Sequence, residues 1–276
     1  MPLPSPHLLI IGGGTMGAAI LRAAIAGDRA FVDPATVTVC EPDAAKREAL
    51  QQWGVSAIAA PAGIGPAQEI RQILWAVKPQ FFAVAAGAWR PHLHDTDTHI
   101  SIMAGVPIAA LASALGSSRI VRVMTNTPAQ IGLGTTAVAL APGAPDAHAE
   151  FAMQLFAACS SHVQRVPESM LDAFTALVGS GPAYLDYLAE AMIEAAPTVG
   201  IPAFMAEQLV RSTLHGAVEL WLASEDATPA QLRAAVTSKG GTTAAACETL
   251  DAHKVKAAFA AAIKAGTARA TELAKL

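Results

Sequence analysis

The chain has 276 residues, of which 53% are hydrophobic and 14% charged, and its formal net charge is −4. This length predicts one large domain or two modest ones with a substantial buried core. No polybasic stripe is present, which argues against nucleic acid as the main partner. The clearest apolar run, residues 81–89, is far too short to span a bilayer, so no membrane partner is expected.

The amino terminus and the cysteines bear on the cellular compartment. The opening segment MPLPSPHLLIIGGG has no basic n-region and its apolar run ends in glycines, so no signal peptide is expected. Cys40, Cys159 and Cys247 are widely spaced, odd in number and form no CxxC pair, a pattern typical of reduced thiols without zinc. We therefore expect a cytoplasmic protein.

The first half of the chain alternates short apolar runs with helical segments. Alternation of this kind predicts βαβ units and a parallel sheet. A helix is expected over residues 15–27, with Gly27 at its C-cap, and another over residues 43–54. The expected strands are residues 7–11, 36–40, 55–59, 69–77, 98–105, 119–126 and 134–142.

From about residue 166 the pattern becomes almost wholly helical. Long helices are expected over residues 203–224 and again near the carboxyl end. We therefore predict an α/β Rossmann-type domain, residues 1–165, followed by an all-helical domain, residues 166–276. Its helices are rich in alanine and bury little area each, so pairing with a second copy is one interpretation. The other is that alanine is simply the best helix former. One expected helical stripe consists of Leu185, Leu188, Ala189, Met192 and Ala196.

The segment IIGGGTMG contains the spacing Gly12-x-Gly14-x-x-Gly17 between the first strand and the first helix. In this context the pattern is typical of a dinucleotide site. Gly12 permits a tight turn, Gly14 lets the backbone approach a pyrophosphate, and Gly17 lets the helix pack on the strand. Thr15 and Met16 open the helix, whose positive end faces the phosphate charge.

Glu41 follows the second strand, where a Rossmann domain reads the adenosine ribose. A carboxylate there accepts hydrogen bonds from ribose hydroxyls and repels a 2′-phosphate, which favours NADH over NADPH. Lys46 and Arg47 in the next helix would soften that repulsion, so both cofactors stay open. A solvated loop carboxylate is the alternative interpretation of Glu41.

Three further strand ends supply candidate cofactor contacts, because ligands of open α/β sheets lie beyond the carboxyl ends of the strands. Surface or turn roles are the alternatives for Lys78 and Asn126. The candidates are Ala76, Lys78 and Pro79 in WAVKPQ, Ala104 and Gly105 in SIMAGV, and Asn126 in MTNTPA.

The segment TSKGGTT, residues 237–243, places two glycines and two threonines at a predicted helix start. A single Ser or Thr suffices to cap a helix, so the surplus indicates that a ligand is held there. A glycine-rich helix start offers unpaired N–H groups and the positive end of the dipole to a small anion.

These segments together identify a family. In order, IIGGGTMG, WAVKPQ, SIMAGV, VMTNTPAQIG, DAFTALVGSGPAYLDYLAEA and TSKGGTT resemble the pyrroline-5-carboxylate reductases over nearly the whole chain. The resemblance implies NAD(P)H-dependent reduction of 1-pyrroline-5-carboxylate to L-proline, the last step of proline synthesis. It also implies that the helical domain forms an interlocked homodimer, with a decamer as a larger assembly that the family admits.

The resemblance implies that Ser238, Gly240, Gly241, Thr242 and Thr243 bind the substrate. Backbone N–H groups of this segment would hold the carboxylate, and the Thr243 hydroxyl would face the ring nitrogen. Hydride transfer to an iminium needs orientation and a hydrogen-bonding oxygen rather than a strong base. The chain departs from the family pattern at four places. Lys239 stands in place of a proline, Val178 in place of a serine, and Ala234 and Ala235 where polar residues are common. The second strand ends in CEPD, residues 40–43, where the family often has a more NADPH-friendly loop with Arg or Ser.

The residues also bear on other activities. A β-hydroxyacid dehydrogenase normally needs a lysine on the first interdomain helix, and DAFTALVGSGPAYLDYLAEA holds none. Reduction of a related cyclic imine and a non-catalytic dinucleotide sensor stay open. SGPAY is expected to form a tight turn, with Tyr184 either lining the site or packing in the core. The loop PHLHDTDTH is interpreted as polar rather than as a metal site, so no metal is expected.

Overall fold

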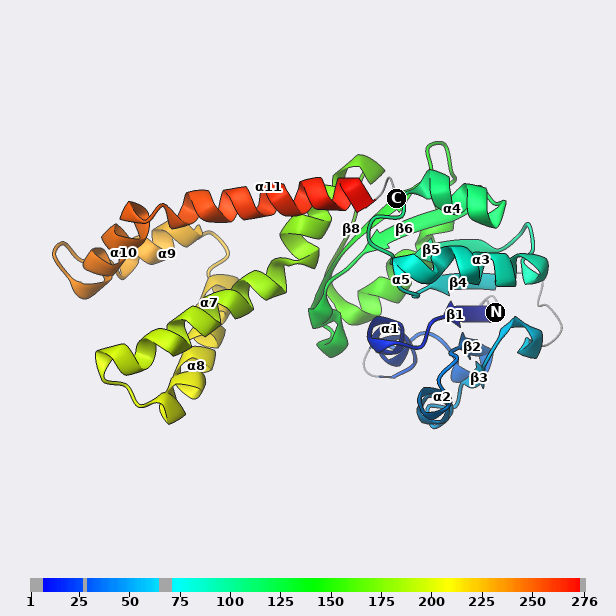
Figure 1. Cartoon of the computed structure of the whole chain (residues 1–276), viewed down its shortest axis with the longest axis horizontal. Coiled ribbons are helices and arrows are strands. Elements are labelled where there is room, and N and C mark those ends of the chain that lie inside the picture. Colours follow the sequence, from blue (N-terminus) through cyan, green and yellow to red (C-terminus); the bar gives the residue numbers. More distant parts are fainter. Residues whose placement is uncertain (1–6, 27–28, 65–70, 274–276) are drawn as a thin grey trace. The chain divides into compact units, whose positions relative to one another are not determined.

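The structure is a computed structural model that describes residues 7–26, 29–64 and 71–273 (Figure 1). The chain forms two compact units, one comprising Met1–Ser180 with Ala265–Leu276 and the other Gly181–Lys264. The first unit thus extends past residue 165, and the domain boundary given above stays a prediction. Among the described residues, no helix is long and apolar enough to cross a membrane.

The first unit is built on one sheet. Within the described residues it has eight strands in the order β3-β2-β1-β4-β5-β6-β7-β8. The predicted strands are confirmed, and β8 is an additional one that the sequence did not indicate. The strands are β1 (His7–Ile11), β2 (Val37–Cys40), β3 (Ser56–Ile58), β4 (Arg71–Trp75), β5 (Thr98–Ser101), β6 (Ile120–Met124), β7 (Gly134–Leu140) and β8 (Ser160–Arg165).

The strand order creates a switch point beside β1. Strand β1 pairs in parallel with β2 on one side and with β4 on the other. The chain thus adds β2 and β3 on one side of β1 and then crosses to the other side to add β4 and the later strands. Strands β4, β5 and β6 continue the parallel pairing, whereas β6 and β7 pair antiparallel. In open α/β sheets, ligands bind at the carboxyl ends of the strands at such a switch point.

Helices cover both faces of this sheet. Successive residues of a strand point to opposite faces, and nearly all of these side chains are apolar, so each face needs a layer of helices to bury it. Leu8 and Ile10 of β1 share a core with helices α1, α2 and α5. Leu9 and Ile11 face the other way, into a core with α3, α4 and α6. The helices of this unit are α1 (Thr15–Ile25), α2 (Ala44–Gln51), α3 (Phe82–Trp89), α4 (Ile108–Leu115), α5 (Ala147–Cys159) and α6 (Leu171–Phe174).

The second unit is helical, as predicted. The prediction of a tight turn at SGPAY is wrong in its local form, because a π-helical turn, Thr175–Gly179, follows α6 and the next helix begins at Gly181. Helix α1 ends at Ile25, and the Gly27 cap expected for it lies outside the described residues. The remaining helices are α7 (Gly181–Ala195), α8 (Ala203–Ala223), α9 (Pro229–Ala235), α10 (Thr242–Ala252) and α11 (Val255–Leu273), the last of which reaches into the first unit.

Candidate functional sites

The turn after β1 requires glycine at position 12. Gly12 has a φ of +107°, a conformation that residues with a side chain rarely adopt. A Cβ atom there would lie 2.7 Å from the carbonyl oxygen of Ala76 and 2.8 Å from its carbon. The N–H of Gly12 donates to the carbonyl of Cys40 at 2.9 Å. The turn is therefore wedged between the ends of β2 and β4, at the switch point.

Gly14 is not required by the protein's own packing. Its φ is −70°, and a Cβ atom built there would have no heavy atom within 4 Å. By contrast, a Cβ atom at Gly17 would run into the carbonyl oxygen of Gly12. Packing thus explains Gly12 and Gly17, while Gly14 leaves open space over the turn, as the approach of a pyrophosphate to the backbone requires.

Helix α1 begins without a side-chain cap. Gly14 is its N-cap residue, no side chain caps the helix, and its first turn holds no acidic residue. The N–H groups of Thr15, Met16 and Gly17 therefore lack the partner that a preceding helical turn would give them. Their partial positive charge is suited to an anion, and the pyrophosphate of a dinucleotide is an anion of that kind.

Glu41, directly after β2, lies against the glycine turn. It is only 7% exposed. One carboxylate oxygen accepts the N–H of Gly13 at 2.9 Å, and the other accepts the N–H of Asp43 at 3.1 Å. The Arg47 guanidinium donates to the backbone carbonyls of Glu41 at 2.8 Å and Pro42 at 2.6 Å. The interpretation of Glu41 as a solvated loop residue is therefore wrong.

The ends of β4 and β5 lie at the same edge of the sheet. The N–H of Ala76 donates to the last residue of β1 at 2.9 Å, which fixes this segment beside the glycine turn. Lys78 is exposed and precedes the short 3₁₀ turn Pro79–Phe81, so its ammonium group is available to a ligand. After β5, Gly105 has a φ of +72° and is buried, while Ala104 is half-buried.

Asn126 supports the chain after β6. Its side-chain nitrogen donates to the carbonyl of Val178 at 3.3 Å, and its oxygen accepts the N–H of Thr135 at 2.9 Å. The amide thus joins β6, β7 and the π-helical turn. Its predicted contact with the nicotinamide half of the cofactor stays a prediction, and this structural role was not foreseen from the sequence.

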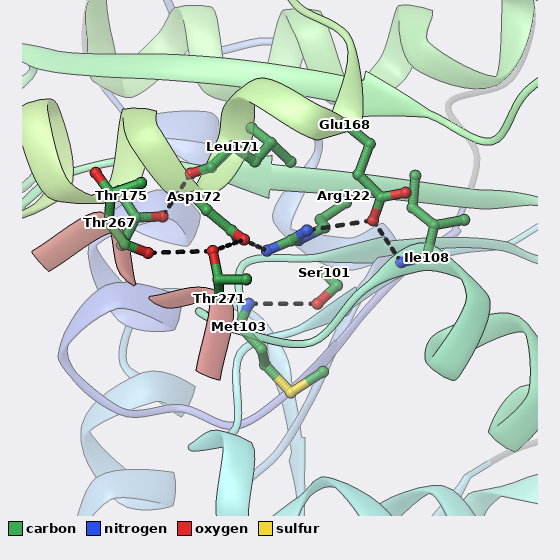
Figure 2. A network of polar contacts seen from close by, with 10 residues as sticks. All are labelled: Ser101, Met103, Ile108, Arg122, Glu168, Leu171, Asp172, Thr175, Thr267 and Thr271. Atoms are coloured by element: carbon green, nitrogen blue, oxygen red, sulfur yellow. Dashed lines mark hydrogen bonds and ion pairs between the residues drawn. The ribbon is translucent and has the colours of Figure 1, made fainter. Parts of the chain in front are cut away.

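A buried arginine, Arg122, forms a network of ion pairs that was not predicted from the sequence. Arg122 of β6 lies 3.2 Å from Glu168 and 3.2 Å from Asp172, and Figure 2 shows the guanidinium between the two carboxylates. Glu168 also accepts the N–H of Ile108 at 2.7 Å, which caps α4, and Asp172 accepts the Thr271 hydroxyl at 3.0 Å. The network ties α4, α6 and the end of α11 to the sheet, close in the chain to the loop with Ala104 and Gly105.

The turn before α10 also depends on glycine. Gly240 has a φ of +72°. A Cβ atom at Gly241 would run into the Ser238 hydroxyl, and the N–H of Gly241 donates to the Ser238 carbonyl at 3.0 Å. Gly241 is the N-cap of α10, and no side chain caps this helix. The start of α10, like that of α1, thus has a glycine N-cap and no side-chain cap.

The two threonines after this turn offer free hydroxyl groups. Thr242 is exposed and Thr243 half-buried, and neither side chain is hydrogen-bonded to another described residue. The exposed Lys239 precedes them. Unpaired N–H groups, free hydroxyls and a nearby ammonium group together form a surface that suits a small carboxylate.

Comparison with known proteins places these features in one family. Residues 168–273 match the family model described as pyrroline-5-carboxylate reductase dimerisation. A pyrroline-5-carboxylate reductase of Synechocystis sp. is 36% identical over 276 residues, covering 98% of this chain and 99% of the relative. The chain belongs to the pyrroline-5-carboxylate reductase family.

Other pyrroline-5-carboxylate reductases agree over the same length. That of Thermus thermophilus is 36% identical, with 97% of this chain and 98% of the relative covered. The solved structure of a pyrroline-5-carboxylate reductase from Coxiella burnetii superposes with a TM-score of 0.86 at 29% identity, covering 99% of this chain and all of the other. Residues 7–105 also match a model described as coenzyme F420-dependent NADP oxidoreductase. Both the Rossmann-type sheet and the helical region are therefore confirmed.

Apart from the CEPD segment at the end of β2, the residues that depart from the family pattern lie in the π-helical turn, at the end of α9 and in the turn before α10. Val178, where a serine is usual, lies in the π-helical turn and uses its carbonyl to accept from Asn126. Lys239 is exposed, as are Ala234 and Ala235 at the end of α9. None of these substitutions changes a glycine on which the two turns depend.

The cysteines of this reductase-family chain are all free. Burial raises the pKa of the Cys40 thiol, and the neighbouring Glu41 carboxylate raises it further. Burial likewise raises the pKa of Cys159. Both groups stay protonated thiols near neutral pH and contribute as small apolar side chains.

The histidine-rich segment before β5 is only partly a surface loop. Asp97 is buried and accepts the N–H of His94 at 2.7 Å, and buried His99 accepts from the Trp75 indole at 3.3 Å. Asp95 is exposed. No group of three metal-ligating side chains converges within the described ranges.

Proposed function

We propose that the protein reduces the C=N bond of 1-pyrroline-5-carboxylate to give L-proline, with NAD(P)H as the hydride donor. The observation that carries the proposal is the full-length match to reductases of this name, at 36% identity over 98% of the chain. It is supported by a chain that keeps an open glycine turn in one unit and an uncapped, threonine-bearing helix start in the other.

The segment before α10 would hold the substrate. The substrate is a small anion, and its carboxylate is the group that unpaired N–H donors and a positive helix end stabilise. Gly240 and Gly241 let the backbone approach that carboxylate, and Ser238 and Thr242 add hydroxyl groups at its edge. Lys239, being exposed, adds long-range attraction rather than a fixed contact.

Thr243 would orient the reacting bond. Its hydroxyl is half-buried and is not taken by another described residue, so it is available to the ring nitrogen. A C=N carbon accepts hydride more readily once the nitrogen is protonated, and the product amine keeps that proton. A fixed hydroxyl beside the nitrogen stabilises and orients this form, and it need not transfer the proton itself.

The first unit would hold the dinucleotide. When bound, NAD(P)H supplies the hydride. The N–H groups at the start of α1 would bind the pyrophosphate over the open space at Gly14, and Glu41 would face the adenosine ribose. Lys78, Pro79 and the residues after β5 and β6, including Asn126, would contact the rest of the cofactor.

We further propose the division into a dinucleotide-binding domain, residues 1–165, and a substrate-binding and dimerisation domain, residues 166–276. The dimerisation model matches residues 168–273. The second unit exposes large apolar side chains, among them Phe204 at 86% and Tyr187 at 73%. Burial of that surface favours an interlocked homodimer, which in turn would assemble into a decamer.

A cofactor-oxidation assay tests the proposed reaction. Purified protein with 1-pyrroline-5-carboxylate should consume NADH or NADPH, followed by the loss of reduced-nicotinamide absorbance at about 340 nm, and should form L-proline. A related cyclic imine such as a six-membered ring analogue is run in parallel. Turnover of the analogue alone would reassign the substrate, and no turnover with either cofactor would refute the proposal.

Replacing Thr243 tests the role of its hydroxyl. Thr243→Ala should lower kcat/KM at least about tenfold, since a group oriented on the reacting nitrogen is lost. The unfolding midpoint should change little, because no described residue depends on this hydroxyl. Thr249→Ala is the control, as this exposed α10 hydroxyl donates to the Ala245 carbonyl at 3.0 Å and, among the described residues, to no other group. Equal rates for both variants would remove Thr243 from the site.

A further inference from the structure

The dinucleotide site carries a fixed negative charge at the position that distinguishes the two nicotinamide cofactors. Glu41 follows β2 directly, and its backbone N–H donates to the carbonyl of Ile58 at 2.9 Å, which fixes it to the sheet. The residue is only 7% exposed, so its side chain does not extend into solvent. In a Rossmann domain the residue at this position faces the 2′ substituent of the adenosine ribose.

Two backbone groups hold the carboxylate in place. It accepts from Gly13 at 2.9 Å and from Asp43 at 3.1 Å. A Cβ atom at Gly13 would lie 3.1 Å from the Cβ of Glu41, so the glycine turn and the carboxylate are closely packed. A carboxylate has about four lone-pair positions, and these two bonds leave others for further donors.

The positive charge nearby does not neutralise this carboxylate. Arg47 directs one guanidinium nitrogen to the backbone carbonyls of Glu41 and Pro42, at 2.8 Å and 2.6 Å. Across the described ranges, Glu41 forms no ion pair with a Lys, Arg or His side chain. Asp43, which caps α2 through the N–H of Lys46, adds a second carboxylate to the same loop.

We propose that Glu41 makes the site select NADH over NADPH, an inference that rests on the dinucleotide site proposed above. The 2′-hydroxyl of NADH is a hydrogen-bond donor for the remaining lone pairs of Glu41. The 2′-phosphate of NADPH has no donor at neutral pH and carries a charge of about −1.5 to −2, which a buried carboxylate repels. The preference would run against the family model for residues 7–105, whose description names NADP.

Direct binding to the full-length protein tests the preference. NADH and NADPH are titrated separately at the same ionic strength, with nicotinamide fluorescence as the readout, so that turnover is not needed. We expect NADH to bind at least about tenfold more tightly, a difference of about 1.4 kcal/mol. The preference should persist as salt is raised, because salt screens the repulsion of a buried carboxylate much less than that of an exposed one.

Two variants separate charge from shape. Glu41→Gln keeps the size of the side chain and one acceptor but loses the charge, so NADPH affinity should rise at least about tenfold relative to NADH. Glu48→Gln removes the same charge from the exposed face of α2 and should leave the ratio unchanged.

The possible results have distinct meanings. Equal affinities, or tighter binding of NADPH by the native protein, would overturn the selection. An equal loss of both cofactors in Glu41→Gln would show that the carboxylate only supports the turn, and would overturn it too. If neither dinucleotide binds, the cofactor site itself falls. A clear NADH preference without turnover of 1-pyrroline-5-carboxylate would support this inference and refute the proposed reaction.

Discussion

Gly14→Ala should separate folding from dinucleotide binding. The added Cβ meets no heavy atom within 4 Å, and a φ of −70° suits alanine. Reduced freedom of the unfolded chain stabilises the variant by about 0.4–1 kcal/mol. The weaker N-cap preference of alanine costs a similar amount, roughly 0.5–1 kcal/mol. The free energy of unfolding should therefore stay within about 1 kcal/mol of the native value.

Dinucleotide affinity should fall in the same variant. The methyl group would occupy the space through which a phosphate reaches the uncapped start of α1. A hydrogen bond to a charged group contributes about 1.5–3 kcal/mol, so the loss of one corresponds to a decrease of roughly 10- to 100-fold in affinity. Calorimetric titration with the oxidised dinucleotide measures the affinity, and urea denaturation measures the stability.

Two other glycines provide control variants, one expected to lose stability and one expected to keep it. Gly12→Ala should destabilise by more than about 2 kcal/mol, because φ is +107° and the new Cβ would lie 2.7 Å from a backbone oxygen. Gly87→Ala, on the exposed face of α3 with open space around it, should retain affinity and gain about 0.5–1 kcal/mol. Native affinity in Gly14→Ala would refute the pyrophosphate site at α1, and a large loss of its stability would refute the argument from open space.

Two more predictions concern stability. Arg122→Met should lower the free energy of unfolding by about 3–5 kcal/mol, since two partly buried carboxylates lose their partner. The control, Arg211→Met, removes one member of an exposed ion pair on α8 and should cost less than about 1 kcal/mol. Similar losses of stability in the two variants would contradict the network's role. Because the pKa values of Cys40 and Cys159 are raised by burial, the stability they contribute is complete below their ordinary pKa of 9.0 and is lost as pH rises above it. Replacing both by alanine should therefore flatten the decline of the unfolding midpoint above about pH 9, and an unchanged slope would exclude these thiols as its cause.

The sequence was a good guide wherever a local pattern determines structure. The apolar runs of β1, β4 and β6 are buried on both sides, and such runs stand out from their surroundings. Strand β8 was missed because SSHVQR is polar and mostly exposed, so its pairing with β7 is visible only in the fold. The glycine spacing at Gly12, Gly14 and Gly17 predicted a turn whose geometry the structure now explains.

Contacts between distant residues were beyond sequence reasoning. Arg122 meets carboxylates 46 and 50 residues further along the chain, and only the packing of α6 on the sheet brings them together. The available signal was a lone arginine in the apolar strand RIVRVM, a residue that needs a partner when buried. Asn126 was placed at the right strand end, but its bond to Val178 depends on the π-helical turn, which no pattern announced.

The first unit has a consequence for how the chain is made. It includes Ala265–Leu276, where Ala270 is buried and Thr271 donates to Asp172. A ribosome therefore completes the whole of Gly181–Lys264 before it supplies the segment that finishes the first unit. Domains usually fold in turn as they emerge, from the amino terminus onward. Here the first unit begins at the amino terminus but is completed only by the last residues of the chain. Until those residues are synthesised, Asp172 lacks the hydrogen bond from Thr271.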